Sequence, residues 1–117
     1  MEIKKVLKGQ FQFLNECKST RNGFCHKTTL FDNNGNQIAT KTNNYLNRTW
    51  ECYQYQSVMR CCLCKRIEKL QKEFLEKWKS ENNIKRFLKK EKEIALEHFE
   101  QLYEIKQLRK IYKELEY

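Results

Sequence analysis

The sequence predicts an α+β fold in which a small antiparallel sheet is followed by two long helices that form a helical hairpin. Two observations support this fold class. Before residue 47, short runs rich in Asn, Thr and Phe alternate polar and apolar side chains, and all three Gly residues lie there. After residue 47, Leu, Ile, Lys and Glu recur at helical spacing. The 117 residues suit one domain, so we expect residues 1–117 to share a single core.

A three-stranded meander is expected over residues 1–46. Its first strand contains Gln10 to Phe13, where polar and aromatic side chains alternate with a period of two. Ile3 to Leu7 extends this strand upstream, and Gly9 marks a bulge in it. A sheet of three strands needs an element packed across its apolar face to be stable, so the helical half of the chain must supply that cover.

The other two strands are joined by the hairpin signal Asn34-Gly35. A tight hairpin needs positive φ at its central residues, and Asn and Gly tolerate this conformation best. We therefore expect this turn to connect a strand over Phe24 to Phe31 with a strand over Gln37 to Thr42.

Two long amphipathic helices are expected next, over residues 49–79 and 83–116. Apolar residues recur at intervals of three and four along both segments, and either Asn47 or Thr49 can cap the first helix. We expect the first turns of the first helix to cover the sheet, and the two apolar stripes to pack together as in a short antiparallel coiled coil. Residues 80–83 contain no Gly or Pro to force a reversal, so one unbroken helix that dimerises is the alternative.

The composition favours a charged cytoplasmic protein over a membrane protein. Lys and Arg outnumber Asp and Glu by 24 to 15, which gives a formal charge of +9. No stretch approaches the roughly 18 apolar residues that span a bilayer, and the first residues lack the apolar region of a signal peptide. We therefore expect a cytoplasmic location and no membrane partner.

Enzymatic machinery is not recognisable in the sequence. The two His residues are His26 and His98, and the spacing places His98 on the apolar stripe of the second helix, as expected for a packed His. No Gly-x-Ser-x-Gly turn is present, and three Gly residues do not make a phosphate-binding loop. We therefore expect no catalysis and no cofactor, and a function in binding.

Six Cys residues are the candidate metal ligands. Cys61 and Cys64 form one pair at i, i+3, but zinc usually takes two such pairs, and Cys25 and His26 point to opposite faces of a strand. Disulfides are disfavoured because no export signal is recognised. We expect reduced Cys side chains that pack as small apolar residues, and no metal site.

Basic residues gather where the second helix is expected to begin. Glu91 is the one acidic residue among them. Such a cluster is suited to contact the phosphates of nucleic acid or an acidic patch on a protein. A Lys-rich solvated helix face is the alternative interpretation. The candidate contact residues are Lys85, Arg86, Lys89, Lys90 and Lys92.

The junction between the sheet and the first helix is the other candidate binding surface. It combines four aromatic residues with an Arg and several amide side chains. Tyr53 and Tyr55 are two residues apart and point about 200° apart on a helix, so at least one of them is exposed. Aromatic and Arg side chains are enriched at protein interface hot spots. We expect partner contacts from Lys41, Arg48, Trp50, Tyr53 and Tyr55.

The same junction resembles a segment of small host-takeover proteins encoded by phages. Their pattern Tyr-x-Asn-Arg-Thr-Trp-Glu-x-Tyr-x-Tyr-x-Ser-Val follows a short β-hairpin, and it runs here from Tyr45 to Val58. Some proteins of this build are similar to anti-CRISPR proteins, which inhibit an RNA-guided nuclease by binding its surface without an active site of their own. The segment Cys61-Cys62-Leu63-Cys64 lies outside the pattern.

Three hypotheses for the function follow. The resemblance implies a phage-derived inhibitor that binds a host defence nuclease stoichiometrically in the host cytoplasm, such as a CRISPR effector of type VI or type II. The basic residues suggest instead a small DNA- or RNA-binding accessory protein of a phage or mobile element. The third hypothesis is a virion or assembly component that oligomerises through its helices. The sequence leaves both a monomer and a helix-mediated dimer open.

Overall fold

The computed structural model describes residues 2–45 and 56–115, and over these ranges it contains one antiparallel sheet and three helices. The strands are β1 (Glu2–Lys8), β2 (Phe11–Ser19), β3 (Phe24–Phe31) and β4 (Gln37–Tyr45), which lie in the order β1-β2-β3-β4. The helices are α1 (Gln56–Glu81), α2 (Lys89–Glu100) and α3 (Tyr103–Glu114). The fold is α+β, but the predicted three strands and two long helices are wrong.

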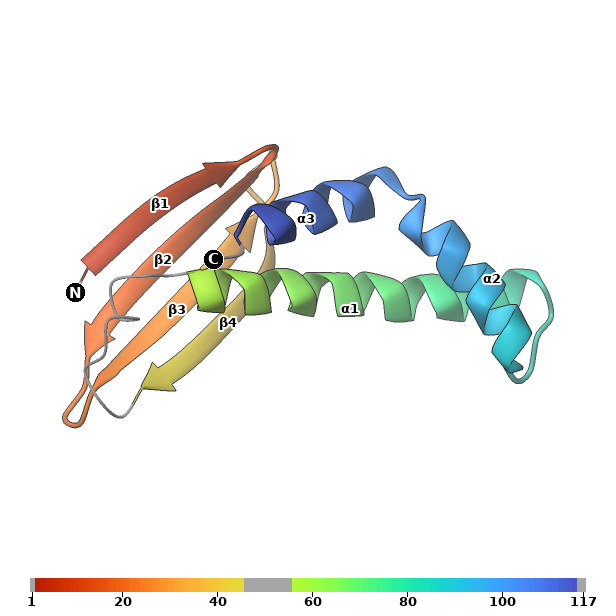
Figure 1. Ribbon diagram of the computed structural model, residues 1–117, viewed down its shortest axis with the longest axis horizontal. Helices are drawn as coiled ribbons and strands as arrows, with labels where there is room; N and C mark the ends of the chain where they lie inside the picture. Colours follow the sequence, from red (N-terminus) through yellow and green to blue (C-terminus); the bar gives the residue numbers. More distant parts are fainter. Residues whose placement is uncertain (1, 46–55, 116–117) are drawn as a thin grey trace.

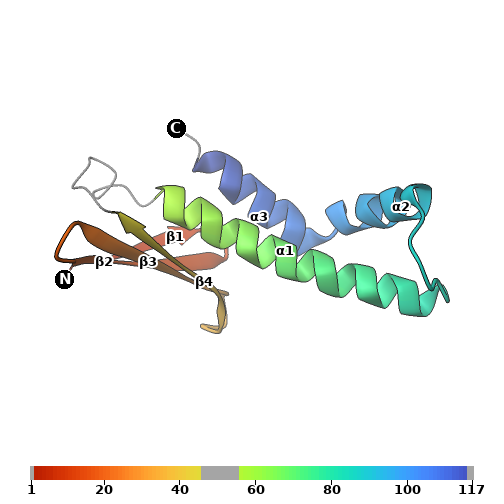
Figure 2. The same ribbon diagram turned by 90° about the horizontal axis from the view of Figure 1, so that it is seen from below.

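The helices α1 and α3 lie side by side on one face of the sheet (Figures 1 and 2). Helix α1 contacts β3 and β4 with its first turns and then projects beyond the sheet, where α2 packs against it. The molecule is therefore elongated, with extents of 52 × 28 × 25 Å. No helix in the described part of the chain combines the length and apolarity needed to cross a bilayer.

The segment predicted as one bulged strand forms two strands, β1 and β2. Gly9 has a φ of +60°, and the chain reverses at Gly9 and Gln10 so that Lys8 pairs with Phe11. A Gly at the first central position is typical of a two-residue hairpin turn, because only Gly adopts this backbone conformation at no steric cost. The pairing brings Val6 opposite Phe13, so that β1 adds an edge strand to the sheet.

The hairpin between β3 and β4 forms where the sequence places it, and β4 extends three residues beyond Thr42. Gly35 has a φ of +81°, and the Oδ1 atom of Asp32 accepts hydrogen bonds at 2.9 Å from the backbone amides of Asn36 and Asn34. These hydrogen bonds lower the pKa of the Asp32 carboxyl, with that from Asn36 the largest cause. The turn is thus held by its own side chain as well as by the Asn-Gly pair.

The hydrophobic core lies between the sheet and the two helices that cover it. Its fully buried members include Phe13 and Leu30 from the sheet, Val58 and Leu63 from α1, and Leu108 from α3. Burial of each such side chain stabilises the fold by roughly 1.5–3 kcal/mol. The first turns of α1 therefore anchor the helical half of the chain on the sheet.

The chain reverses direction after α1, within residues 82–88. Asn83 adopts a φ of +53°, and the amide of Ile84 donates a hydrogen bond to the carbonyl of Lys79 at 2.9 Å. Asn is the non-Gly residue that best tolerates this left-handed conformation, so it ends the helix where no Gly is present. The alternative of one unbroken helix is therefore wrong, and the next helix begins at Lys89 and not at residue 83.

The predicted second helix is broken into α2 and α3 between Glu100 and Tyr103. Leu102 has an extended conformation with a ψ of 138°, and Arg109 bridges the break by an ion pair to Glu100 at 2.7 Å. Helix α2 buries Ala95 and Phe99 near the distal half of α1, whereas α3 buries its apolar stripe where α1 meets the sheet. One straight helix could not direct its apolar stripe to both surfaces. The break therefore changes the direction of the chain, so that the stripe of α3 faces the core.

Replacement of Leu108 by Ala should lower the free energy of unfolding by about 2–5 kcal/mol, because this side chain has no exposed surface. Leu102→Ala is the matched control, since both Leu residues lie on the stripe of the predicted second helix but Leu102 is 42% exposed. Its cost should stay below about 1 kcal/mol. Urea denaturation followed by circular dichroism measures both values, and equal losses would contradict the break at Leu102.

Candidate binding surfaces

The cluster of basic residues forms the end of the molecule farthest from the sheet (Figure 1). Two of its members lie in the loop that precedes α2, and the other three lie in the first turn of α2, so only part of the cluster is helical. All five side chains are exposed. We call this surface the basic tip, and it consists of Lys85, Arg86, Lys89, Lys90 and Lys92.

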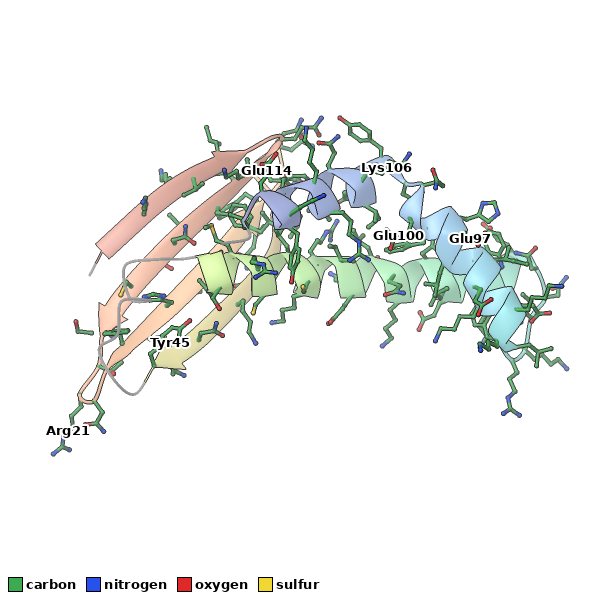
Figure 3. All side chains as sticks on the ribbon, viewed as in Figure 1. Arg21, Tyr45, Glu97, Glu100, Lys106 and Glu114 are labelled. Atoms are coloured by element: carbon green, nitrogen blue, oxygen red, sulfur yellow. The ribbon has the colours of Figure 1, made fainter. Side chains whose placement is uncertain are left out.

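The charges of the helical half are segregated along the chain. Residues 77–92 contain seven Lys and Arg against two Glu, whereas residues 93–104 contain four Glu and no Lys or Arg. Of these Glu residues, Glu97 and Glu100 are labelled on α2 in Figure 3. Within the described ranges, the one ion pair at the basic end joins Lys77 and Glu81 at 3.9 Å. The five charges of the basic tip are therefore not neutralised by ion pairs.

The basic tip does not stabilise the helix that carries it. Three of its Lys residues lie in the first turn of α2, at the positive end of the helix dipole. A cation in this position costs about 0.3–1 kcal/mol, and neighbouring like charges add to the cost. Glu91 is the one acidic residue in this turn, and its carboxylate accepts a 3.5 Å hydrogen bond from the amide of Leu88.

Aromatic side chains support the loop that carries the basic tip. The Trp78 ring lies 5.9 Å from Phe74 and 4.9 Å from His98, which joins the end of α1 to α2. The ammonium of Lys79 lies 5.6 Å from the centre of the Phe87 ring. His98 was expected to be packed, and its ring does contact Trp78, although the residue as a whole is exposed. The basic residues thus project from a packed base.

The predicted partner-binding set is not assembled in the described part of the chain. Arg48, Trp50, Tyr53 and Tyr55 lie outside the described residues. Lys41 is half-buried on β4, where it pairs in register with Thr28 on the face that α1 covers.

The basic tip and the sheet lie at opposite ends of the molecule (Figure 1). Helix α1 begins beside the sheet, ends at the basic tip, and spans about 38 Å at 1.5 Å per residue. Tyr45, which precedes the junction, lies at the sheet end together with Arg21, whereas Glu97 lies at the far end (Figure 3). A compact partner therefore contacts the basic tip or the sheet end, and not both at once.

An aromatic cluster on β3 and β4, on the face of the sheet that α1 covers, was not predicted from the sequence. His26 has no exposed surface, and its ring lies 5.9 Å from Phe24 and 5.2 Å from Tyr45. The signal was the alternation from Phe24 to Leu30, which places His26 on the same face as both apolar residues. His26 therefore packs in the fold beside Tyr45.

A buried cluster of hydrogen-bonded side chains links β2 and β3 to α1. The Thr28 hydroxyl donates a 2.6 Å hydrogen bond to the side-chain oxygen of Asn15, whose amide group donates to the Met59 sulfur at 3.5 Å. The Cys62 thiol donates to the Thr28 carbonyl at 3.8 Å, and burial raises the pKa of Cys62 to about 12. A thiol in this environment stays protonated and acts in packing.

The remaining Cys residues are not a metal site in the described part of the chain. Cys61 is exposed, which contradicts the prediction that the Cys residues all pack as apolar side chains, and Cys17, Cys25 and Cys64 are half-buried. Over residues 2–45 and 56–115, no group of three or more His, Cys, Asp or Glu side chains is arranged to hold a metal ion.

A small pocket of about 210 Å³ lies where the two hairpin turns meet α3. Its polar side chains bond to one another: Arg66 pairs with Glu104 at 3.1 Å, and the Gln10 amide donates to the Tyr103 hydroxyl at 3.1 Å. The Asp32 carboxylate, also in the lining, caps its own turn. The ion pair therefore joins α1 to α3, and the Gln10–Tyr103 hydrogen bond holds α3 against the turn between β1 and β2.

Protein-family models, curated proteins and solved structures were compared with this chain, and none of them matches it.

Thiol labelling of the native protein should distinguish two neighbouring Cys residues on α1. At pH 8 the exposed Cys61 should react quickly with a disulfide reagent, whereas the buried and protonated Cys62 should react only as fast as the protein unfolds. Cys61→Ser should therefore remove one fast-reacting thiol, and Cys62→Ser should remove none. If the Cys62→Ser protein had one fast-reacting thiol fewer than the wild type, the α1 register would be wrong.

The same thiol predicts a loss of stability at high pH. The pKa of Cys62 is raised from 9.0 to about 12 in the folded protein, so the unfolded chain loses this proton first. Its contribution to stability should be present below pH 9 and should disappear as the pH rises toward 12. Urea denaturation at several pH values measures the effect, and Cys62→Val should show a shallower decline between pH 9 and 11.

Proposed function

We propose that this chain is a small basic nucleic-acid-binding protein of the cytoplasm, acting stoichiometrically and without catalysis. The observation that supports this proposal is the basic tip, in which five exposed cations from a loop and a helix gather without ion-pair partners in the described chain. Such a cluster releases counterions from a phosphate backbone when it binds, which is the main driving force of non-specific nucleic-acid binding.

Comparison with α1 argues against the alternative that the basic tip is only a solvated helix face. Residues 68–77 of α1 contain three Lys and three Glu, the usual mixture on a solvent-exposed helix. The basic tip lacks this mixture and places cations at the unfavourable end of the α2 dipole. A surface that lowers the stability of its own helix is better explained by an anionic partner than by folding.

The inhibitor of an RNA-guided nuclease stays a prediction from the resemblance of residues 45–58 to phage proteins. Most of its expected contacts fall outside the described residues. Affinity purification from a host lysate, with and without nuclease treatment, separates the two functions. Recovery of a defence protein that survives nuclease treatment would favour the inhibitor, and recovery of nucleic acid alone would favour the present proposal.

Neutralisation of the basic tip should weaken nucleic-acid binding and reduce its dependence on salt. We expect the combined substitutions Lys85→Gln, Lys89→Gln and Lys90→Gln to raise the Kd for a labelled oligonucleotide by about tenfold or more at moderate salt. The slope of log K against log salt should fall by about 2, because each lost phosphate contact removes about 0.7–0.9. Fluorescence anisotropy over a series of salt concentrations measures both quantities.

A matched control removes the same charge from another exposed surface. Lys106, Lys110 and Lys113 are exposed on α3, and their replacement by Gln should raise the Kd by less than about threefold. Equal weakening by both triple variants would mean that net charge alone drives binding. Absence of binding by the wild-type chain at low salt would refute the proposed function.

A further inference from the structure

We infer that the sheet face opposite to the described helices is a second nucleic-acid contact surface and that it selects single strands. This inference rests on the proposed function and adds the kind of nucleic acid bound. The surface, which we call the open face, is the side of β1 to β4 opposite to α1 and α3 (Figure 2). It lies on the sheet, whereas the basic tip lies beyond the far end of α1.

The strand register determines which side chains form the open face. Phe13 and Leu30 are fully buried beneath the helices, so the neighbouring Leu14 and Phe31 point to the other side. Gln12 of β2 pairs in register with Leu7 of β1 on one side and with Phe31 of β3 on the other. Leu14 lies two residues further along β2 and shares their face. The apolar strip therefore crosses three strands diagonally through Leu7, Leu14 and Phe31, with the polar Gln12 between Leu7 and Phe31.

The apolar strip is accessible to a partner. Leu7 is 76% exposed and Ile3 on the same strand is 55% exposed, while Leu14 and Phe31 are half-buried by their neighbours. An exposed apolar surface of this kind commonly marks a binding site.

Basic side chains lie along one side of the apolar strip and favour an anionic partner. Lys5, Lys18 and Lys27 come from three different strands and share the open face by register, and all three are exposed. Among the described residues of this face, Glu16 is the one acidic side chain. Two copies of such a face would repel each other, so charge complementarity favours an anionic partner and not a second copy.

The polar residues of the open face favour nucleic acid over a lipid surface. Gln12 separates Leu7 from Phe31, and the exposed Thr42 lies beside Lys27. These side chains offer hydrogen bonds to base edges, whereas a lipid surface takes up a continuous apolar face. Aromatic and apolar side chains reach the flat faces of bases only when the bases are unstacked, so the strip favours single strands.

The test is a nuclear magnetic resonance titration of the ¹⁵N-labelled full chain with a twelve-residue oligothymidine and with a duplex of the same length. We expect the oligothymidine to shift amide signals of β2 and β3, and the duplex to shift only signals of residues 82–92. The variant Lys5→Gln, Lys18→Gln, Lys27→Gln should bind oligothymidine at least tenfold more weakly, with a salt slope reduced by about 2 at about 0.7 per contact.

A control variant on the other face of the sheet removes the same number of positive charges. Lys4, Lys8 and Lys41 lie on β1 and β4 but share the face that the helices cover, so their joint replacement by Gln should change oligothymidine affinity less than threefold. Phe31→Leu should weaken oligothymidine binding and leave duplex binding unchanged, with the thermal melting curve as the check on folding. A uniform effect of both Lys variants would overturn the inference.

The remaining outcomes separate this inference from the proposed function. Shifts confined to residues 82–92 with both ligands would overturn the open face as a nucleic-acid surface and would leave the basic tip standing. Binding to neither ligand would remove the proposed function together with the inference. Shifts of β2 and β3 caused by vesicles with anionic lipid, and not by oligothymidine, would assign the open face to a lipid surface and overturn the inference.

Discussion

The packing of α1 on the apolar face of the sheet is the contact on which the rest of the structure depends. Phe13 and Leu30 on the sheet and Val58 and Leu63 on α1 are all fully buried in this layer. A small antiparallel sheet is not stable without such cover, and a helix of this length is not stable without a packed face. The hydrogen-bonded group of Asn15, Thr28 and Cys62 lies in the same layer and joins helix and sheet by polar contacts.

The difference in length between α1 and the sheet explains the shape of the molecule. The 26 residues of α1 extend well beyond strands of seven to nine residues, so the distal half of the helix needs another partner. Helix α2 supplies it, and α3 then returns to the sheet, which requires the break at Leu102. The same arrangement carries the basic tip away from the sheet, and the described helices cover only one face of the sheet.

The candidate surfaces could be predicted from the sequence only in part. The cluster from Lys85 to Lys92 was recognisable because its members are close in the sequence, and they remain close in space. Lys41 was predicted to contact a partner, yet it is half-buried on the face of the sheet that α1 covers, opposite to the face that carries Lys18 and Lys27. The open face was not foreseen, because Gly9 was interpreted as a bulge and the edge strand β1 was therefore missing from the predicted sheet.

Local patterns determined the elements of this protein: the alternation in β2 and β3, the Asn34-Gly35 turn, the apolar stripe of α1 and the charge of the basic tip. Each of these depends on residues within a few positions of one another, so the sequence alone predicts them. Only the tertiary structure decided where the second helix breaks and which Lys residues share a face. These features depend on how far α1 extends past the sheet and on strand register, which are set by packing between residues distant in the sequence.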